Sequence, residues 1–326
     1  MKQLKVGIAG YGVVGNRRKE YIDLNPNLKI IAVCDQKFTP EDNIVDGILC
    51  FPDYHALLEN DLDIIFVCMS NDMAAEVTIA ALKTGKHVFC EKPPARSLDE
   101  MDKVIAVEEA NPHLKLMYGF NHRYHDSVKD ALKIMESNTL GKVINIKGVY
   151  GKAKLITFNQ PDWRTKREIS GGGVLLELSH EIDYANWFFG PFLRVQAVLK
   201  NSGTLDIDVE DTADLILTNN KGMNVVIHLD FCSRCSIRKC KLYGSKATMN
   251  LDFLDKKIEI VDSEQKTLLF NKEDDLENMF VNQLTYFLKG VFHEDLIKNN
   301  VDDSIETLKI IESARLSNQL NKVVEI

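Results

Sequence analysis

The sequence predicts an α/β protein of two domains: a doubly wound parallel sheet over residues 1–121, and an α+β domain with an open, mainly antiparallel sheet over residues 122–326. In the first part, short apolar runs alternate with segments of helical periodicity, which is typical of parallel sheets with crossover helices. Beyond Asn121, strand-like runs follow one another across hairpin-like turns, which favours antiparallel pairing. A chain of 326 residues is also long for a single core.

The first crossover unit occupies residues 5–34. Lys5–Gly10 is a short apolar run ending in glycine, Arg17–Leu24 carries apolar residues at helical spacing, and Leu28–Cys34 is a second apolar run. This order predicts a parallel βαβ unit. The alternation continues, with helices expected over 54–58, 74–83 and 98–110 and strands over 63–68, 87–90 and 114–118.

The second domain begins with an expected helix over 127–136. Strands are then expected over 143–150, 194–199, 213–218, 224–231, 238–243, 247–251 and 257–261. Gly171–Gly173 opens a helix between the first two strands, and helices near 277–290 and 303–318 close the chain, either within this domain or packed on the first. Runs such as Asn219–Gly222 are typical of hairpin turns.

Composition is that of an ordinary globular enzyme, with 45% hydrophobic and 27% charged residues. A formal net charge of −8 argues against a nucleic-acid-binding surface, which needs clustered Lys and Arg. Charged residues interrupt every apolar run well short of the ~20 residues that span a bilayer, and the chain starts without a signal-peptide core. We therefore expect a cytoplasmic protein whose partner is a small molecule, not nucleic acid or a membrane.

The cysteines are odd in number, seven, and scattered, which favours reduced thiols over disulfides. Three lie in apolar strand-like runs: Cys34, Cys68 and Cys90. Cys232 and Cys235 have the C-x-x-C spacing, so a metal or redox site is the alternative. Because residues 225–231 alternate like a strand and no second ligand pair lies nearby, we interpret these cysteines as small residues on a strand and expect no metal.

A glycine motif follows the first strand. Gly10, Gly12 and Gly15 form G-x-G-x-x-G, with Val13 and Val14 before the last glycine. Between a strand and a helix, the first glycine permits a tight turn, the second lets the backbone approach a pyrophosphate, and the third lets helix and strand pack closely. The helix N-terminus then directs N–H groups and its positive dipole end at the phosphates. The pattern is typical of a Rossmann dinucleotide-binding domain.

Asp35 stands at the end of the second strand, twenty residues beyond Gly15. A carboxylate at this place binds the hydroxyls of the adenosine ribose. The 2′-phosphate of NADP would meet like charge there, so we expect NAD as the cofactor. Lys37 would partly neutralise this repulsion, and NADP remains the second possibility.

Glu91, Lys92 and Pro93 follow the strand over 87–90, at the sheet edge where open α/β sheets bind ligands. A lysine there can exchange a proton with a carbinol as hydride moves, provided that desolvation or a neighbouring cation lowers its pKa toward neutrality. We expect Lys92 to be catalytic, and both Glu91 and Lys92 to lie beside the cofactor. The alternative is an ordinary surface charge.

Several motifs together resemble the glucose-fructose oxidoreductase, inositol dehydrogenase and rhizopine catabolism (Gfo/Idh/MocA) family. They are the glycine motif, Gly85–Val88 running into Glu91–Pro93, Gly119–Tyr124, and Gly171–Gly173 with His180–Asp183. The similarity covers nearly the whole chain. It implies a Rossmann domain followed by a β-sheet domain, NAD(P) chemistry on a carbinol or ketone of a sugar or cyclitol, and a catalytic Lys92. Arg123, in the third motif, is expected to contact substrate.

The family's later motif, Asp-x-x-x-His-x-x-Asp, is altered here. Glu177 replaces the first Asp, and either His180 or Glu181 takes the place of His, so the register is open. On one helix, residues i and i+3 share a face, so Glu177 and His180 are expected to reach one site. We expect His180 to bind the substrate hydroxyl and relay protons with Lys92, because imidazole titrates near neutral pH. Glu177 is expected to be catalytic with it, and Glu181 and Asp183 to bind substrate.

A second departure follows the fourth strand, where the family has Thr-Pro-Asn-x-x-His and this chain has Met69–Ala74. Asn71 is retained and is expected to contact the nicotinamide side of the cofactor. The absent histidine concerns the substrate and not the fold.

Five cations gather before the Gly171 turn: Lys152, Lys154, Arg164, Lys166 and Arg167. Against a negative net charge this is a local concentration. One interpretation is a solvated loop. The other is a lid for an anionic sugar, such as a sugar phosphate, nucleotide sugar or sugar acid, with Arg164 on the anion and Trp163 on a ring face.

Two further functions fit the same cofactor motif. A nucleotide sensor would bind NAD(P) without turnover, although an intact Lys92 argues against it. A reductase of a non-sugar ring would leave the basic segment unexplained. The exposed face of an open sheet predicts a homodimer or homotetramer.

Overall fold

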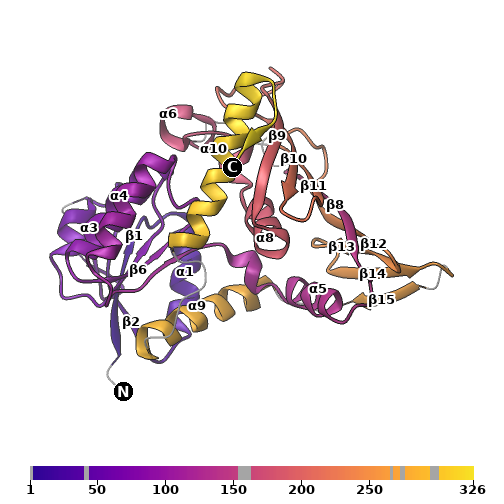
Figure 1. Cartoon of the computed structure of the whole chain (residues 1–326). Coiled ribbons are helices and arrows are strands. Elements are labelled where there is room, and N and C mark those ends of the chain that lie inside the picture. The colour runs from indigo at the N-terminus through magenta and orange to yellow at the C-terminus, as the bar shows by residue number, and fades with distance from the viewer. Residues whose placement is uncertain (1–2, 40–43, 153–162, 265–266, 272–275, 294–300) are drawn as a thin grey trace. The chain divides into compact units, whose positions relative to one another are not determined.

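The computed structural model describes residues 3–39, 44–152, 163–264, 267–271, 276–293 and 301–326. The chain divides into two compact units, whose elements Figure 1 labels. Unit 1 comprises residues 1–120 and 280–305, and unit 2 comprises residues 121–279 and 306–326. Each unit therefore takes one segment from the closing helices.

Unit 1 is built on a seven-stranded sheet in the order β3-β4-β2-β1-β5-β6-β7. Its strands are β1 (Leu4–Ala9), β2 (Leu28–Cys34), β3 (Ile44–Val45), β4 (Ile48–Phe51), β5 (Ile64–Val67), β6 (His87–Cys90) and β7 (Leu116–Tyr118). All neighbours pair in parallel except β3 and β4. The chain winds outward in both directions from β1, which confirms the predicted doubly wound sheet and puts the switch point between β1 and β5.

Helices cover both faces of this sheet: α1 (Val13–Asp23), α2 (Tyr54–Leu58), α3 (Asn71–Lys83), α4 (Leu98–Glu109) and α9 (Leu276–His293). In Figure 1, α3 and α4 lie on one face and α1 and α9 on the other. Phe66 and Phe89 stack at 5.1 Å between ring centroids, and Phe287 of α9 packs edge-on against Phe89 at 5.5 Å. All three side chains are fully buried. The strands are apolar on both faces because both faces are covered.

Unit 2 is built on a nine-stranded sheet in the order β15-β14-β13-β12-β8-β11-β10-β9-β16. Its strands are β8 (Val143–Gly151), β9 (Phe192–Lys200), β10 (Thr212–Asn219), β11 (Asn224–Asp230), β12 (Ile237–Gly244), β13 (Ala247–Asp252), β14 (Lys257–Asp262), β15 (Thr267–Asn271) and β16 (Val324–Glu325). Among these strands β8 and β11 pair in parallel, and the other pairs are antiparallel. The predicted mainly antiparallel sheet is thus confirmed.

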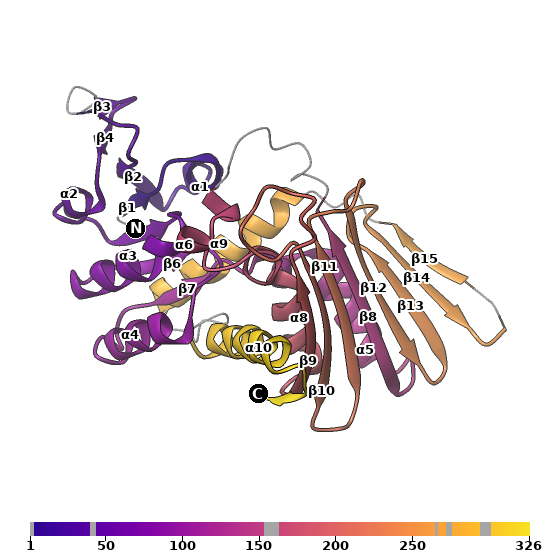
Figure 2. The same ribbon diagram turned by 90° about the horizontal axis from the view of Figure 1, so that it is seen from above.

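Helices pack on one face of this sheet: α5 (Asp126–Glu136), α7 (Val174–Glu177) and α8 (His180–Phe189), and Figure 2 shows α5 and α8 on the same side. Short turns of helix also occur at Asn121–Tyr124, Trp163–Thr165 and α6 (Arg167–Ser170), and α10 (Val301–Leu320) closes the chain. Side chains of α10 bind β9, where Ser317 and Asn318 accept hydrogen bonds from the backbone N–H groups of Ala197 and Leu199.

The other face of the sheet carries apolar side chains that the described part of the chain leaves exposed. Val198 and Ile216 are 44% and 43% exposed. On the same face, the His228 imidazole lies between two aspartates, 2.7 Å from Asp214 and 3.3 Å from Asp230. The hydrogen bond to Asp230, together with that to Asp214, raises the pKa of His228 to about 9.

The interpretation of the C-x-x-C cysteines as strand residues is wrong. β11 ends at Asp230, so Cys232 and Cys235 lie in the connection to β12. Within the described ranges, His, Cys, Asp and Glu side chains form no group of three that could hold a metal ion. Of the helices described, none is both long and apolar enough to cross a bilayer.

Candidate functional site

Two glycines of the turn after β1 are required by contacts within unit 1. Gly10 has φ of +90°, and a Cβ there would lie 2.4 Å from the carbonyl oxygen of Cys68. A Cβ on Gly15 would lie 2.0 Å from the carbonyl oxygen of Gly10. The end of β1, the connection after β5 and the first turn of α1 are therefore too close for a side chain.

At Gly12, by contrast, no contact within the described chain requires glycine. A Cβ on Gly12 would meet no described atom within 4 Å, and its φ of −82° suits any residue. Gly12 is the N-cap of α1, whose first turn carries neither an acidic side chain nor a side-chain cap. Val13 is 78% exposed and Val14 is half-buried. Open space above the backbone and uncapped N–H groups at a helix N-terminus fit a pyrophosphate.

Asp35 binds the backbone of the glycine turn. Its Oδ2 accepts a hydrogen bond from the Tyr11 N–H at 2.9 Å, and its Oδ1 accepts one from the Lys37 N–H at 3.1 Å. Each carboxylate oxygen has two lone pairs, so acceptor capacity remains for ribose hydroxyls. The Lys37 ammonium donates to the Tyr11 carbonyl oxygen at 2.5 Å. This end of the site fits a ribose diol.

The other expected cofactor residues follow neighbouring strands of the same sheet. Asn71 begins α3 after β5 and is 5% exposed, whereas Lys92 follows β6 and is half-buried. Carboxyl ends of parallel strands meet at one edge, so unit 1 brings these residues to the edge that carries the glycine turn.

Glu91 is held by an arginine that the sequence analysis did not single out. Arg18 of α1 donates from Nε to Glu91 Oε1 at 2.7 Å, its Nη2 lies 2.6 Å from the same oxygen, and its side chain is 3% exposed. A Cβ on Gly119 would lie 2.6 Å from Glu91 Oε2, so the glycine after β7 makes room for this carboxylate. Glu91 thus links the glycine-turn helix to the backbone of Lys92.

In unit 2, the expectation that Glu177 and His180 share one helix face is wrong. Glu177 is the last residue of α7, Leu178 leaves the helical conformation at φ −104° and ψ 27°, and α8 starts at His180. The three-residue interval therefore spans a break between two helices. Both side chains are partly accessible.

Three residues expected to bind substrate are instead buried in ion pairs. Arg123 binds Asp183 through Nε at 2.9 Å and Nη2 at 2.6 Å, and the two side chains are 4% and 1% exposed. Glu181 binds Arg238 of β12 at 2.6 Å, with side chains 1% and 9% exposed. A buried charge whose partner is removed is strongly destabilising, so these carboxylates are committed to their arginines.

Arg238 also connects this buried pair to His180. Its Nη1 lies 2.6 Å from His122 Nε2. Because a guanidinium only donates, His122 Nε2 is the acceptor in this contact. The His122 ring packs edge-on against the His180 ring at 4.6 Å between centroids. The His180 ring is therefore supported by a buried chain of contacts formed by His122, Arg238 and Glu181.

The basic segment carries less uncompensated charge than expected. Glu177 Oε1 lies 2.9 Å from Lys152 Nζ and 3.6 Å from Arg164 Nε. Arg167 Nη2 lies 3.7 Å from Glu210 Oε2. Arg164 also lies over the Trp163 ring at 4.5 Å. Lys154 falls outside the described residues.

Arg18 and Arg238 were missed, although a signal existed for Arg238. On β12 the inward positions are Arg238, Cys240 and Leu242, so the strand's alternation places one charge among apolar residues. A charge at such a position requires a buried partner. The sequence gives no such signal for Arg18. Arginines on helices are commonly exposed, so its burial could not be inferred from its position.

Two models of one family match the chain in succession. A model described as an oxidoreductase family with an NAD-binding Rossmann fold matches residues 4–120, and the GFO/IDH/MocA C-terminal domain matches residues 128–250. The chain therefore belongs to the Gfo/Idh/MocA family of oxidoreductases. It is an NAD-binding dehydrogenase, which confirms the predicted family, fold, class of activity and cofactor.

Named relatives are similar over much of the chain. Myo-inositol 2-dehydrogenase from Thermotoga maritima is 26% identical over 312 residues, covering 88% of each chain. Inositol 2-dehydrogenase from Salmonella typhimurium is 26% identical over 69% of this chain and 67% of its own length. D-Glucoside 3-dehydrogenase from Escherichia coli is 30% identical over 61% of this chain and 57% of its own length.

Among solved structures, levoglucosan dehydrogenase in complex with NADH and levoglucosan superposes with a TM-score of 0.91 at 18% identity, over the full length of both chains. At that identity the similarity establishes the fold alone.

Proposed function

We propose that this dehydrogenase oxidises a carbinol of a neutral sugar or cyclitol, or reduces the corresponding ketone. The observation that supports a neutral substrate is that carboxylates already bind cations of the basic segment. Glu177 lies within ion-pair distance of Lys152 and Arg164, and Glu210 lies beside Arg167. Relatives named for inositol and for a D-glucoside support the substrate class.

The test is a panel of substrates assayed by NADH absorbance. It pairs neutral compounds (myo-inositol, a methyl glucoside, levoglucosan) with anionic ones (glucose 6-phosphate, glucuronate). We expect the highest kcat/KM among the neutral members. A higher kcat/KM for the anionic members would contradict the proposal. Tight NADH binding with no turnover of any sugar, ring ketone or cyclitol would favour a nucleotide sensor.

Lys92 is assigned the proton transfer. Bound NAD⁺ supplies the hydride acceptor. As hydride leaves the carbinol carbon, the Lys92 amine takes the hydroxyl proton, and it returns the proton when the ketone is reduced. The position of Lys92 after β6, beside a Glu91 anchored by Arg18, supports this role. Asn71 is assigned to the nicotinamide side of the cofactor, and Asp35 to the adenosine ribose.

His180 and Glu177 are assigned to the substrate hydroxyls, and Trp163 with Arg164 to the ring. His180 is preferred over Glu181 because Glu181 is committed to Arg238. Arg123, Glu181 and Asp183 are assigned to positioning. His180→Asn should lower kcat at unchanged stability, whereas Glu181→Gln should lower the free energy of unfolding first. A larger loss of kcat in a stable Glu181→Gln enzyme would reverse the assignment.

The open sheet face is assigned to a homodimer or homotetramer. Exposed Val198 and Ile216 on that face support it, because a second copy would remove these apolar side chains from water. Light scattering at micromolar concentration is the test, and a monomer would refute it. The cytoplasm is the proposed compartment, and buried thiols such as Cys34, Cys90 and Cys240 suit its reducing conditions.

A further inference from the structure

Three consecutive glycines precede Glu177 and His180, and the backbone requires glycine at Gly171 and Gly173 for different reasons. Gly171 ends α6 with φ of +75°. A Cβ on Gly172 would lie 2.3 Å from Arg315 Nη2, and a Cβ on Gly173 would lie 1.9 Å from the Glu210 carbonyl oxygen. The glycine turn is therefore shaped by two residues distant in sequence, Arg315 on α10 and Glu210 just before β10.

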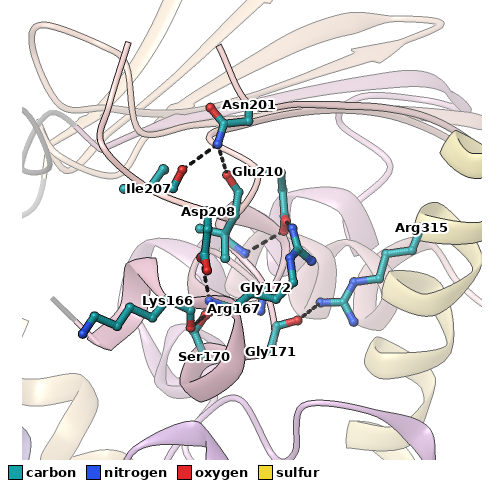
Figure 3. A network of polar contacts seen from close by, with 12 residues as sticks. Lys166, Arg167, Ser170, Gly171, Gly172, Asn201, Ile207, Asp208, Glu210 and Arg315 are labelled. Atoms are coloured by element: carbon teal, nitrogen blue, oxygen red, sulfur yellow. Dashed lines mark hydrogen bonds and ion pairs between the residues drawn. The ribbon is translucent and has the colours of Figure 1, made fainter. Parts of the chain in front are cut away.

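Both residues bind the turn directly, as Figure 3 shows. Arg315 Nη2 donates to the Gly171 carbonyl oxygen at 2.8 Å, and the Gly173 N–H donates to Glu210 Oε1 at 2.8 Å. The backbone of Glu210 adds a second hydrogen bond to the turn, because its carbonyl oxygen accepts from the Val174 N–H at 3.1 Å. Glu210 is 7% exposed.

One residue, Gly173, connects the contacts that Glu210 and Arg315 make with the turn, here called the clamp, to Glu177. The Gly173 N–H is held by Glu210, and the Gly173 carbonyl oxygen accepts from the Glu177 N–H at 3.0 Å. His180 starts the next helix three residues later. Any shift of Gly173 is thus transmitted through a single turn of backbone to Glu177 and the helix break before His180.

Both clamp residues are themselves fixed. Arg315 Nη1 donates to Glu312 at 3.1 Å on the same helix, and α10 is bonded to β9 through Ser317 and Asn318. Asp208, two residues before Glu210, accepts from the Arg167 N–H at 2.6 Å, which fixes the start of α6 to the same loop.

We propose that Glu210 and Arg315 are positioning residues, which hold the Gly171–Gly173 turn so that Glu177 and His180 take their working geometry. The proposal rests on the proposed sugar dehydrogenase function for its kinetic consequence. The structural consequence, a fixed glycine turn, does not depend on that function. The kinetic and the structural consequence are therefore tested separately.

The kinetic test uses Glu210→Ala, Arg315→Ala and the conservative Glu210→Gln. We expect kcat/KM to fall about tenfold to a hundredfold in the alanine variants, the range that a small misplacement costs. The Kd for NADH should change less than about twofold, because the Rossmann residues belong to unit 1. Glu210→Gln keeps an acceptor oxygen for the Gly173 N–H and should retain most activity. A Glu210→Ala/Glu177→Ala double variant should lose less than the product of the single losses.

Arg315 allows a chemical rescue. It lines a pocket of about 330 Å³ together with Arg167, Asn201 and Glu210, so the truncated side chain leaves room for a small cation. Millimolar methylguanidinium should restore part of the activity of Arg315→Ala and none of that of Glu210→Ala. Equal effects on both variants would contradict the assigned contact.

The matched control is Asn219→Ala. Asn219 is 6% exposed and lies at the far end of β10, where its side chain donates to the Phe189 carbonyl oxygen at 2.8 Å and accepts from the backbone of the following turn. It should lower Tm without changing kcat/KM below the transition. If Asn219→Ala and Glu210→Ala reduced kcat/KM alike, the effect would be general destabilisation and the proposal would be wrong.

Hydrogen exchange gives a result that needs no substrate. In Glu210→Ala and Arg315→Ala, amides within 171–180 should exchange faster, while those of β13 and β14 stay unchanged. Unaltered exchange within 171–180 would overturn the clamp even if the enzyme turned over sugars. Accelerated exchange in an enzyme that accepts no sugar would instead support the clamp and reject the proposed substrate.

Discussion

Removing one partner of the buried Arg123–Asp183 pair should destabilise unit 2 far more than removing both. Asp183→Asn removes the negative charge that binds the buried Arg123 guanidinium, 4% exposed, and weakens two hydrogen bonds of 2.9 and 2.6 Å. Hydrogen bonds to charged groups contribute roughly 1.5–3 kcal/mol each. The single variant should therefore lose about 3–5 kcal/mol, the usual cost of breaking a buried pair.

The double replacement Arg123→Met/Asp183→Leu should recover most of this loss, because neither charge then has to be desolvated. As a control, Glu306→Gln removes an ion pair to Lys309 in which both side chains are more than 40% exposed. It should cost less than about 1 kcal/mol.

Urea unfolding followed by tryptophan fluorescence is the assay. Both tryptophans, Trp163 and Trp187, belong to unit 2, and the Arg123 guanidinium lies over the Trp187 ring at 5.4 Å. The signal therefore reports this unit. A single variant that lost less than about 1 kcal/mol, no more than the exposed control, would refute the reasoning, as would a double variant less stable than either single one.

Four other predictions concern the cofactor, the reaction, pH and salt. Asp35→Ser should narrow a preference for NAD over NADP that we expect to be at least about tenfold, since like charges near a surface cost on the order of 1 kcal/mol or more; equal Kd values in the parent enzyme would count against the charge argument. Lys92→Met should bind NADH normally while kcat falls by about 10² to 10⁴, and retained turnover would remove Lys92 from the mechanism. The raised pKa of His228 makes its protonated form stabilising, so the contribution is complete below about 6.5 and is lost as pH rises through about 9; Tm should fall over that window in the parent, and an equal fall in His228→Gln would exclude it as the source. With a neutral substrate, KM should change less than about twofold with ionic strength, whereas a KM that rises with salt and loses this dependence in Arg164→Ala would indicate an anionic one.

The fold and the nucleotide half of the site were predictable because their signals are local. The alternation of apolar runs from Lys5 to Tyr118 already encodes a doubly wound sheet. The glycine motif, with Asp35 at the end of the next strand, lies within one βαβ unit, so sequence distance and spatial distance agree there. The position of Lys92 was predictable for the same reason, since it follows a strand and so lies at the edge where open α/β sheets bind ligands.

Unit 2 was predictable only as a sheet. The spacing of Glu177 and His180 suggested one helix, but α7 ends at Glu177 and α8 starts at His180. Periodicity cannot detect such a break when Leu178 and Ser179 suit a helix interior well enough. Likewise Glu181 and Asp183 looked like substrate ligands, because a carboxylate near a family motif does not show which arginine it faces.

The sequence by itself determined which segments become strands and helices. It also determined where the phosphates of a dinucleotide fit and which lysine follows a strand at the sheet edge. Each of these features depends on residues within about one βαβ unit of each other. Only the tertiary structure decided which charges pair. Arg18 reaches Glu91, Arg238 reaches Glu181 and Arg315 reaches Gly171 across 73, 57 and 144 residues. Such partners are chosen by packing, because a charge removed from water is stable only beside whichever opposite charge or carbonyl the folded chain brings to it.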